Sequence, residues 1–121
     1  IVVGNLHEEF FSLYEKNEET LNKYIGDKQT FICRNGENGA LAITKKDKVI
    51  SKAISISPVD SVGAGDAFNS GFIYASCNGK DIKDSLDTGN QVAAFKLLGS
   101  GARHLPTKEL LEEFNKNNLN A

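Results

Sequence analysis

Residues 60–70, Asp60-Ser-Val-Gly-Ala-Gly-Asp-Ala-Phe-Asn-Ser70, combine a glycine-rich turn with the start of a helix. Gly63, Ala64 and Gly65 carry almost no side chain, so their backbone N–H groups can turn toward one point in space. The first N–H groups of a helix have no partner within the helix, and the helix dipole places partial positive charge there. The stretch therefore predicts an anion-binding site formed by the backbone.

Asp66 places a carboxylate at this predicted anion site. It would compete with a bound anion unless it faces a neutral hydroxyl group and accepts its proton while the amides hold developing negative charge. That arrangement is the chemistry of phosphoryl transfer to an alcohol. The alternative is an ordinary helix N-terminus in which Asp66 only interacts with the dipole. Neither capping nor the dipole requires the run of small residues before it.

The segments on either side of the turn predict a layered α/β domain, with strands first and a block of helices after the turn. Apolar or alternating runs predict strands at Ile1–Val3, Thr30–Cys33, Ala40–Thr44 and Val49–Ser57. Helical spacing and caps predict helices over Leu6–Glu15, from Asn17 to a stop at Gly26, and over Ala64–Cys77, Ile82–Leu98 and Thr107–Phe114, with a frayed tail at Asn115–Ala121. A ligand is expected at the strand-to-helix turns.

Composition narrows the class of protein. The 121 residues carry a formal net charge of −2, which disfavours nucleic acid or an anionic membrane as a general partner. The sequence contains no apolar run of transmembrane length, and we expect a cytoplasmic protein in which Cys33 and Cys77 are buried free thiols. Because Ile1 begins what looks like a strand and the sequence contains no methionine, we expect this chain to be part of a longer polypeptide.

The run Asp60–Phe68 resembles the C-terminal signature of the ribokinase-like sugar kinases, the PfkB family. The resemblance implies Asp66 as the catalytic base and the amides of Gly63, Ala64 and Gly65 as the anion hole in ATP-dependent phosphorylation of a sugar or nucleoside hydroxyl. It implies that residues 1–121 form the C-terminal nucleotide-binding and catalytic part of a ribokinase-like α/β sandwich. The N-terminal substrate-binding part and its β lid, often the dimerisation surface in relatives, are absent from the sequence.

Two shorter motifs match the same family. Asn5-Leu-His-Glu8 has the family's Asn-x-x-Glu spacing, which implies Mg²⁺ held by Asn5 and Glu8 through water; a helix cap by Asn5 with Glu8 as its capping-box partner explains it equally. Gly36-Glu-Asn-Gly39 resembles the turn that borders the nucleotide, although a hairpin turn needing positive φ is the simpler interpretation. Arg34 stands where the family commonly has threonine, and could pair with ATP phosphate or be solvated.

The C-terminal helices add weaker matches. Asn90, in Gly89-Asn-Gln-Val-Ala-Ala94, lies where the family contacts adenine, although small residues there also serve close helix packing. The loop containing Gly101, together with Asp60 and Val62, resembles a site for a monovalent cation such as K⁺. His7 and His104 are expected to be ordinary surface or hydrogen-bonded histidines. The simplest interpretation of six acidic residues is that they lie on solvated helix faces, namely Glu8, Glu9, Glu18, Glu19, Glu112 and Glu113.

Other nucleotide-binding classes fit poorly. The P-loop pattern is absent, and a dinucleotide-binding interpretation of Gly63-Ala-Gly65 fails because Phe68 occupies the third glycine position. Two alternatives to a sugar kinase remain. One is a nucleotide-binding module without catalysis. The other is a vitamin-type kinase of the same superfamily that acts on a hydroxymethyl pyrimidine or pyridine.

Overall fold

A computed structural model describes residues 1–13, 21–56, 62–99 and 106–119. The strands are β1 (Val2–Asn5), β2 (Phe31–Arg34), β3 (Ala40–Ile43) and β4 (Lys48–Ser51). The helices are the π-helical turn η1 (Leu6–Phe10), α1 (Phe11–Leu13), the 3₁₀ turns η2 (Asn22–Tyr24) and η3 (Gly36–Asn38), and the longer α3 (Ala64–Cys77), α4 (Ile82–Leu97) and α5 (Lys108–Leu119). The predicted α/β class is confirmed.

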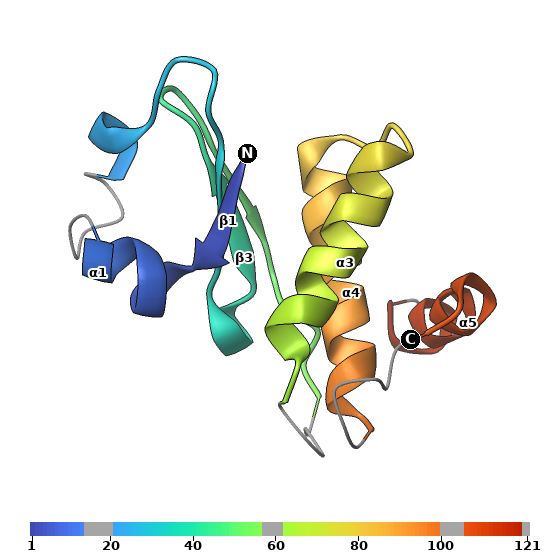
Figure 1. Ribbon diagram of the computed structural model, residues 1–121. Coiled ribbons are helices and arrows are strands. Elements are labelled where there is room, and N and C mark those ends of the chain that lie inside the picture. The colour runs from blue at the N-terminus through green and yellow to red at the C-terminus, as the bar shows by residue number, and fades with distance from the viewer. Residues whose placement is uncertain (14–20, 57–61, 100–105, 120–121) are drawn as a thin grey trace.

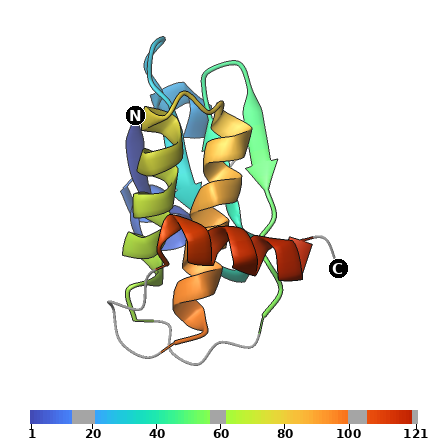
Figure 2. The same ribbon diagram turned by 90° about the vertical axis from the view of Figure 1, so that its right-hand side faces the viewer.

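The strands form a 4-stranded sheet in the order β1-β2-β3-β4. β1 and β2 are parallel, and the β2–β3 and β3–β4 pairs are antiparallel. Helix η1 and α1 cover one face of the sheet, and α3 and α4 cover the other (Figure 1). Helix α5 crosses the outer side of this helix pair (Figure 2), so the molecule has layers of helix, sheet, helix and helix.

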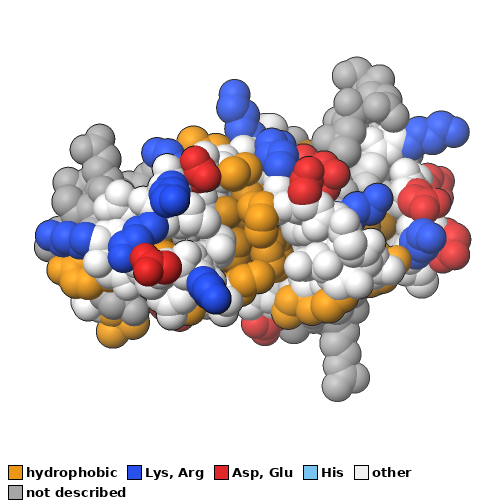
Figure 3. All heavy atoms as spheres, turned by 90° about the horizontal axis from the view of Figure 1, so that it is seen from above, with side chains coloured by type: hydrophobic (Ala, Val, Ile, Leu, Met, Phe, Trp, Pro, Cys, Tyr) orange, Lys and Arg blue, Asp and Glu red, His pale blue; other side chains and the backbone are white. Residues whose placement is uncertain are grey.

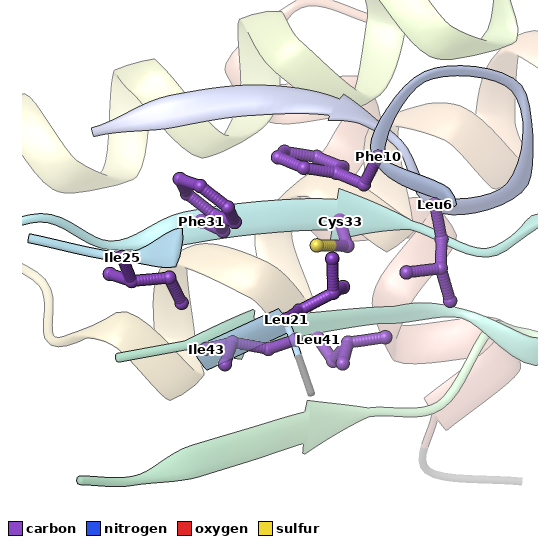
Figure 4. Close-up of a cluster of buried hydrophobic side chains, with 8 residues drawn as sticks. All are labelled: Leu6, Phe10, Leu21, Ile25, Phe31, Cys33, Leu41 and Ile43. Atoms are coloured by element: carbon purple, nitrogen blue, oxygen red, sulfur yellow. The ribbon is translucent and has the colours of Figure 1, made fainter. Parts of the chain in front are cut away.

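Side-chain alternation along the strands divides the core between the two faces. Toward η1 and α1 lies a cluster made of Leu6, Phe10, Leu21, Ile25, Phe31, Cys33, Leu41 and Ile43 (Figure 4). Toward α3 and α4 lies a second cluster made of Ile32, Ala40, Ala42, Phe68, Phe72 and Leu86. Both faces of the central strands are therefore buried, which explains their nearly continuous apolar sequence.

The face seen from above in Figure 3 shows hydrophobic side chains gathered between the sheet and the helix layer. Lys, Arg, Asp and Glu side chains are interspersed on both sides of this apolar band. The visible face therefore carries no block of one charge sign, in keeping with the small net charge of −2.

Helices α3 and α4 approach each other closely through glycine. A Cβ added at Gly71 would lie 2.8 Å from Val92 Cγ2 and 3.1 Å from the Cα of Gly89. A Cβ added at Gly89 would lie 2.6 Å from the ring of Phe68. Small residues are therefore required where the two helices cross, and the packing role expected for small residues of α4 is confirmed at Gly89.

Several predicted boundaries were wrong for tertiary reasons. The last strand ends at Ser51 within the predicted range Val49–Ser57, because Ser51 pairs with Ala40, the first residue of β3, and the described residues 52–56 have no strand partner. The last helix continues to Leu119, beyond the predicted end at Phe114. There the Asn115 side chain donates a hydrogen bond to Gln91 Oε1 over 2.8 Å, and this contact ties the beginning of the segment predicted to fray to α4.

Three further predictions need correction. The first helix begins as a π-helical turn, and its predicted end at Glu15 lies outside the described residues. The helical run before Gly26 ends as a 3₁₀ turn at Tyr24 with Ile25 as its C-cap, so the chain leaves the helix just before Gly26, but Gly26 does not have the positive φ of a glycine stop. The predicted start at Asn17 lies outside the described residues. The two cysteines form no disulfide, as expected, but only Cys33 is buried; Cys77 is exposed in the last turn of α3.

The N-cap of α4 gives a first quantitative prediction. The Asp81 carboxylate accepts a hydrogen bond from the backbone N–H of Asp84 over 2.8 Å. We expect Asp81→Ala to lower the free energy of unfolding by about 1 kcal/mol and Asp81→Asn to lower it little, because asparagine caps as well as aspartate. Urea denaturation of the two variants tests this. An equal loss in both would mean that charge, not capping, is responsible.

Candidate active site

A cavity of about 840 Å³ lies between the ends of the strands and the first turn of α3. Eight of the residues singled out in the sequence line it: Asn5, Glu8, Arg34, Gly36, Gly39, Ala64, Gly65 and Asn90. The segment after β4 (residues 53–56) and side chains of α3 and α4, including Phe68 and Ala93, complete the wall. Residues far apart in sequence thus meet at one site of the size that small-molecule ligands occupy.

The strand register explains this meeting. β1 and β2 run in parallel with Asn5 opposite Arg34, so the last residues of both strands lie at the same edge of the sheet. Helix α3 begins close to this edge, where Arg34 and Gly65 are in contact. Ligands of α/β folds commonly bind at this edge, beyond the carboxyl ends of parallel strands.

The start of α3 has the features of a backbone anion site. Gly63 is the N-cap residue, with φ of 84°, and no side chain caps the helix. The first hydrogen bond within the helix runs from the N–H of Ala67 to the Gly63 carbonyl over 2.9 Å. The N–H groups of Ala64 and Gly65 precede it and therefore have no partner within the helix, and both residues line the cavity.

Asp66 lies in the first turn of α3 and is exposed. It is not among the residues that line the cavity. A group that takes a proton from an acceptor molecule would face that acceptor rather than the nucleotide, so this position is compatible with the predicted role. The role of Asp66 as a base stays a prediction.

The capping interpretation of Asn5 is confirmed, but its predicted partner was wrong. Asn5 Oδ1 accepts hydrogen bonds from the N–H groups of His7 over 3.0 Å and Glu8 over 2.9 Å. The carboxylate that returns to the Asn5 N–H is that of Glu9, over 3.0 Å, not that of Glu8. The wider π-helical turn moves this reciprocal contact one residue further along the chain.

This rearrangement leaves the Glu8 carboxylate available at the cavity wall. Glu8 is exposed and lines the cavity, and its side chain forms no hydrogen bond or ion pair with the residues that the structure describes. Within the described ranges, no three side chains from His, Cys, Asp and Glu group together as metal ligands. One free carboxylate fits Mg²⁺ that keeps most of its waters and binds substrate phosphates, not a metal cage formed by the protein.

The Gly36–Gly39 turn joins β2 to β3 and has the positive φ angles that the hairpin interpretation requires, 56° at Gly36 and 95° at Gly39. Both glycines line the cavity. Asn35, next to Gly36, has its Oδ1 atom 3.0 Å from Nε2 of the exposed His7, which ties the turn to η1. The structural interpretation is confirmed, and contact with a nucleotide stays a prediction.

Asn90 is buried, with 7% of its surface exposed, and its amide group joins α4 to the end of β4. Its Nδ2 atom donates to Ser51 Oγ over 2.8 Å and lies 3.3 Å from the Lys52 carbonyl oxygen. Ser51 Oγ in turn donates to Asp87 Oδ1 over 2.5 Å. This network fixes the chain that enters the cavity wall after β4. The predicted contact of Asn90 with adenine stays a prediction.

The predicted monovalent-cation site falls mostly outside the described residues. Asp60 and Gly101 lie outside the described residues, while Val62 is described and is 62% exposed. His104, which was expected to be an ordinary histidine, also lies outside them.

None of the helices in the described ranges is both long enough and apolar enough to cross a lipid bilayer.

Sequence reasoning missed the residues that hold the site in place. Glu9 was expected to be a solvated acid, yet it accepts hydrogen bonds from Asn5 N–H and Arg34 Nη2, the latter over 3.3 Å. Ser51 and Asp87 were not singled out at all. The spacing of four residues between Asn5 and Glu9 was the one local signal of these contacts. The contacts of Glu9 with Arg34 and of Ser51 with Asp87 join residues that are remote in sequence.

Comparison with known proteins gives a consistent result. The pfkB family carbohydrate kinases match residues 1–109. A ribokinase from Bacillus subtilis is 34% identical over 79 residues, which are 64% of this chain and 27% of that protein. A 5-dehydro-2-deoxygluconokinase from Clostridium perfringens is 33% identical over 104 residues, which are 83% of this chain and 30% of that protein.

Solved structures share the same fold. A fructokinase double mutant from Vibrio cholerae, bound to fructose, ADP and a potassium ion, superposes with a TM-score of 0.78 at 29% identity and covers 88% of this chain. The match covers 38% of the fructokinase chain, so the present sequence spans well under half the length of the relatives it matches. The predicted ribokinase-like α/β arrangement is confirmed.

Proposed function

Because the chain belongs to the pfkB family of carbohydrate kinases, we propose that the protein transfers the γ-phosphoryl group of ATP to a primary hydroxyl group of a sugar or nucleoside. The observation that carries this proposal is the cavity in which the uncapped start of α3, the ends of β1 and β2, and the Gly36–Gly39 turn meet. The ADP bound to the related fructokinase and the ribokinase among the relatives support a nucleotide and a sugar as the reactants.

In this proposal ATP lies along the cavity. The adenine occupies the space between α4, near Asn90, and the Gly36–Gly39 turn, while the phosphates point toward the start of α3. There the N–H groups of Ala64 and Gly65 donate to phosphate oxygens in a setting that the helix dipole makes favourable for negative charge. Arg34, whose guanidinium group lies against Gly65, adds positive charge beside these amides.

The chemical step follows from this placement. Asp66 accepts the proton of the acceptor hydroxyl, whose oxygen forms a bond to the γ-phosphorus as the bond to the β–γ bridging oxygen breaks. ADP leaves with that electron pair. The amides of Gly63, Ala64 and Gly65 stabilise charge on the transferring group, and this positioning supplies most of the catalysis expected for such a reaction.

Two ions complete the proposal. Mg²⁺, held through water by Glu8, would neutralise charge on the ATP phosphates. Asn5, predicted to share this role, would support it by positioning Glu8, because its Oδ1 atom already accepts the N–H groups of His7 and Glu8. A monovalent cation, bound by backbone carbonyl groups near Asp60, Val62 and Gly101, would add to the positive field. We also propose a cytoplasmic location, because Cys33 and Cys77 form no disulfide, as is usual in a reducing compartment.

The test is ADP release from MgATP, measured on the protein encoded by the complete reading frame against a panel of sugars and nucleosides. We expect turnover that depends on one acceptor class and stops when Mg²⁺ is chelated. ATP binding without turnover on any acceptor would instead identify a nucleotide-binding module and contradict the proposed transfer.

A further inference from the structure

Arg34, the last residue of β2, lies against the first turn of α3. A Cβ added at Gly65 would overlap Nη1 of Arg34 and lie 3.0 Å from its Cζ atom, so the guanidinium group packs directly on the Gly65 backbone. The side chain is 22% exposed. Glycine at position 65 therefore leaves the space that this cation occupies.

The guanidinium group is only partly satisfied by the protein. Nη2 donates to Glu9 Oε1 over 3.3 Å, and the same oxygen accepts the Asn5 N–H over 3.0 Å. Nε is buried and has no hydrogen-bond partner among the described residues. A buried N–H group without an acceptor is unfavourable, so the site favours a ligand that supplies one.

The position is also electrostatically unusual. Cations are unfavourable near a helix N-terminus, where the dipole is positive. The carboxylate of Glu9 offsets part of this cost, but it accepts a hydrogen bond only from Nη2 of Arg34. An anion bound between Arg34 and the free amides of Ala64 and Gly65 would interact favourably with both, and a phosphoryl group has the oxygen geometry that a guanidinium binds best.

We propose that Arg34 donates to the γ-phosphoryl group of ATP, so that this anion site is formed by backbone amides and one side chain together, with Glu9 as the residue that positions Arg34. The inference rests on the proposed function. It adds a specific property: Arg34 makes the site discriminate nucleoside triphosphate from diphosphate, because only the triphosphate carries the group that reaches Gly65.

The experiment is equilibrium binding of ADP and of an ATP analogue with an imido group between the β- and γ-phosphorus atoms, measured on the full protein with Mg²⁺. We expect Arg34→Met to weaken binding of the analogue roughly 10–100-fold, the range of a lost charge-assisted hydrogen bond. ADP affinity should change less than about twofold, because ADP lacks the contacted group.

Two further variants separate charge, geometry and position. Arg34→Lys keeps the charge but loses the planar fork and should recover only part of the analogue's affinity. Glu9→Gln should weaken analogue binding by a few-fold and leave ADP binding unchanged, because it loosens Arg34 without removing it. Lys45→Met is the matched control: Lys45 forms an exposed ion pair with Asp27 over 3.0 Å, away from the cavity, and neither affinity should change.

The outcomes are distinct. Equal losses of affinity for ADP and the analogue would place Arg34 on the inner phosphates and overturn the proposal. Unchanged affinities for both nucleotides would also overturn it. If Arg34→Met does not fold, Arg34→Lys decides by the same comparison. A wild-type protein that binds neither nucleotide would overturn the proposed function itself, whereas binding with no γ-phosphate preference would overturn only the role of Arg34.

Discussion

We expect Asp66→Asn to lower kcat by about 10²–10⁴-fold, the range over which a general base contributes. This corresponds to roughly 2.7–5.4 kcal/mol of barrier, at 1.36 kcal/mol for each tenfold change. The physical reason is that asparagine keeps the size and the helix position of Asp66 but cannot accept the acceptor's proton. Affinity for ATP should change little, because Asp66 does not line the cavity.

The matched control is Asp84→Asn. Asp84 lies in the first turn of α4, as Asp66 lies in the first turn of α3, and both residues are exposed. Each substitution therefore removes a similar favourable interaction with a helix dipole, and the two variants should have comparable stability. Acceptor-dependent ADP release, with KM for both substrates, is the measurement. If Asp66→Asn turned over at nearly the wild-type rate, another group would be the base.

The largest effect on stability is expected at Gly39. Its φ is 95°, and a Cβ at this position would overlap the carbonyl oxygen of Ser51 and lie 2.7 Å from the N atom of Ala53. These are backbone atoms and cannot rotate away. We expect Gly39→Ala to lower the free energy of unfolding by about 2–5 kcal/mol, because alanine would be strained at this positive φ and would also overpack against the backbone.

A neighbouring glycine provides the control. Gly36 has φ of 56°, and a Cβ there would meet nothing within 4 Å, so Gly36→Ala carries conformational strain alone, about 1–2 kcal/mol. Denaturant midpoints of the two variants, together with ATP affinity, measure the difference. Gly39→Ala should also weaken ATP binding, because it displaces the chain after β4 that forms one cavity wall. Equal destabilisation of the two variants would contradict the close-approach argument.

Local sequence patterns predicted the elements that depend on neighbours in the chain. The hydrogen bond from the N–H of Leu110 to Thr107 Oγ1, over 3.2 Å, confirms the predicted start of the last helix. The predicted helix Ala64–Cys77 is confirmed as α3, and Gly79 just beyond it has φ of 81°. Such features require only the backbone within one turn of the residue concerned. The strands were recognised for the same reason, although β4 ended early where its partner ended.

Most of the candidate site was recognised residue by residue, but not how it is assembled. Asn5, Arg34, Gly65 and Asn90 were singled out separately. Their meeting around one cavity follows from the parallel pairing of β1 with β2 and from the position of α3 beside it. Pairing of strands separated by a long connection leaves no local signal, so a single sequence could not supply it.

The sequence by itself determined the α/β class, the glycine-rich turn at the start of α3 and the family to which the chain belongs. Each depends on residue types and spacings along the chain. Only the tertiary structure decided that Glu9 holds Arg34 over Gly65 and that Asn90 is hydrogen-bonded to the end of β4. These contacts join residues far apart in sequence, and which buried or charged groups become partners is settled only when the layers pack.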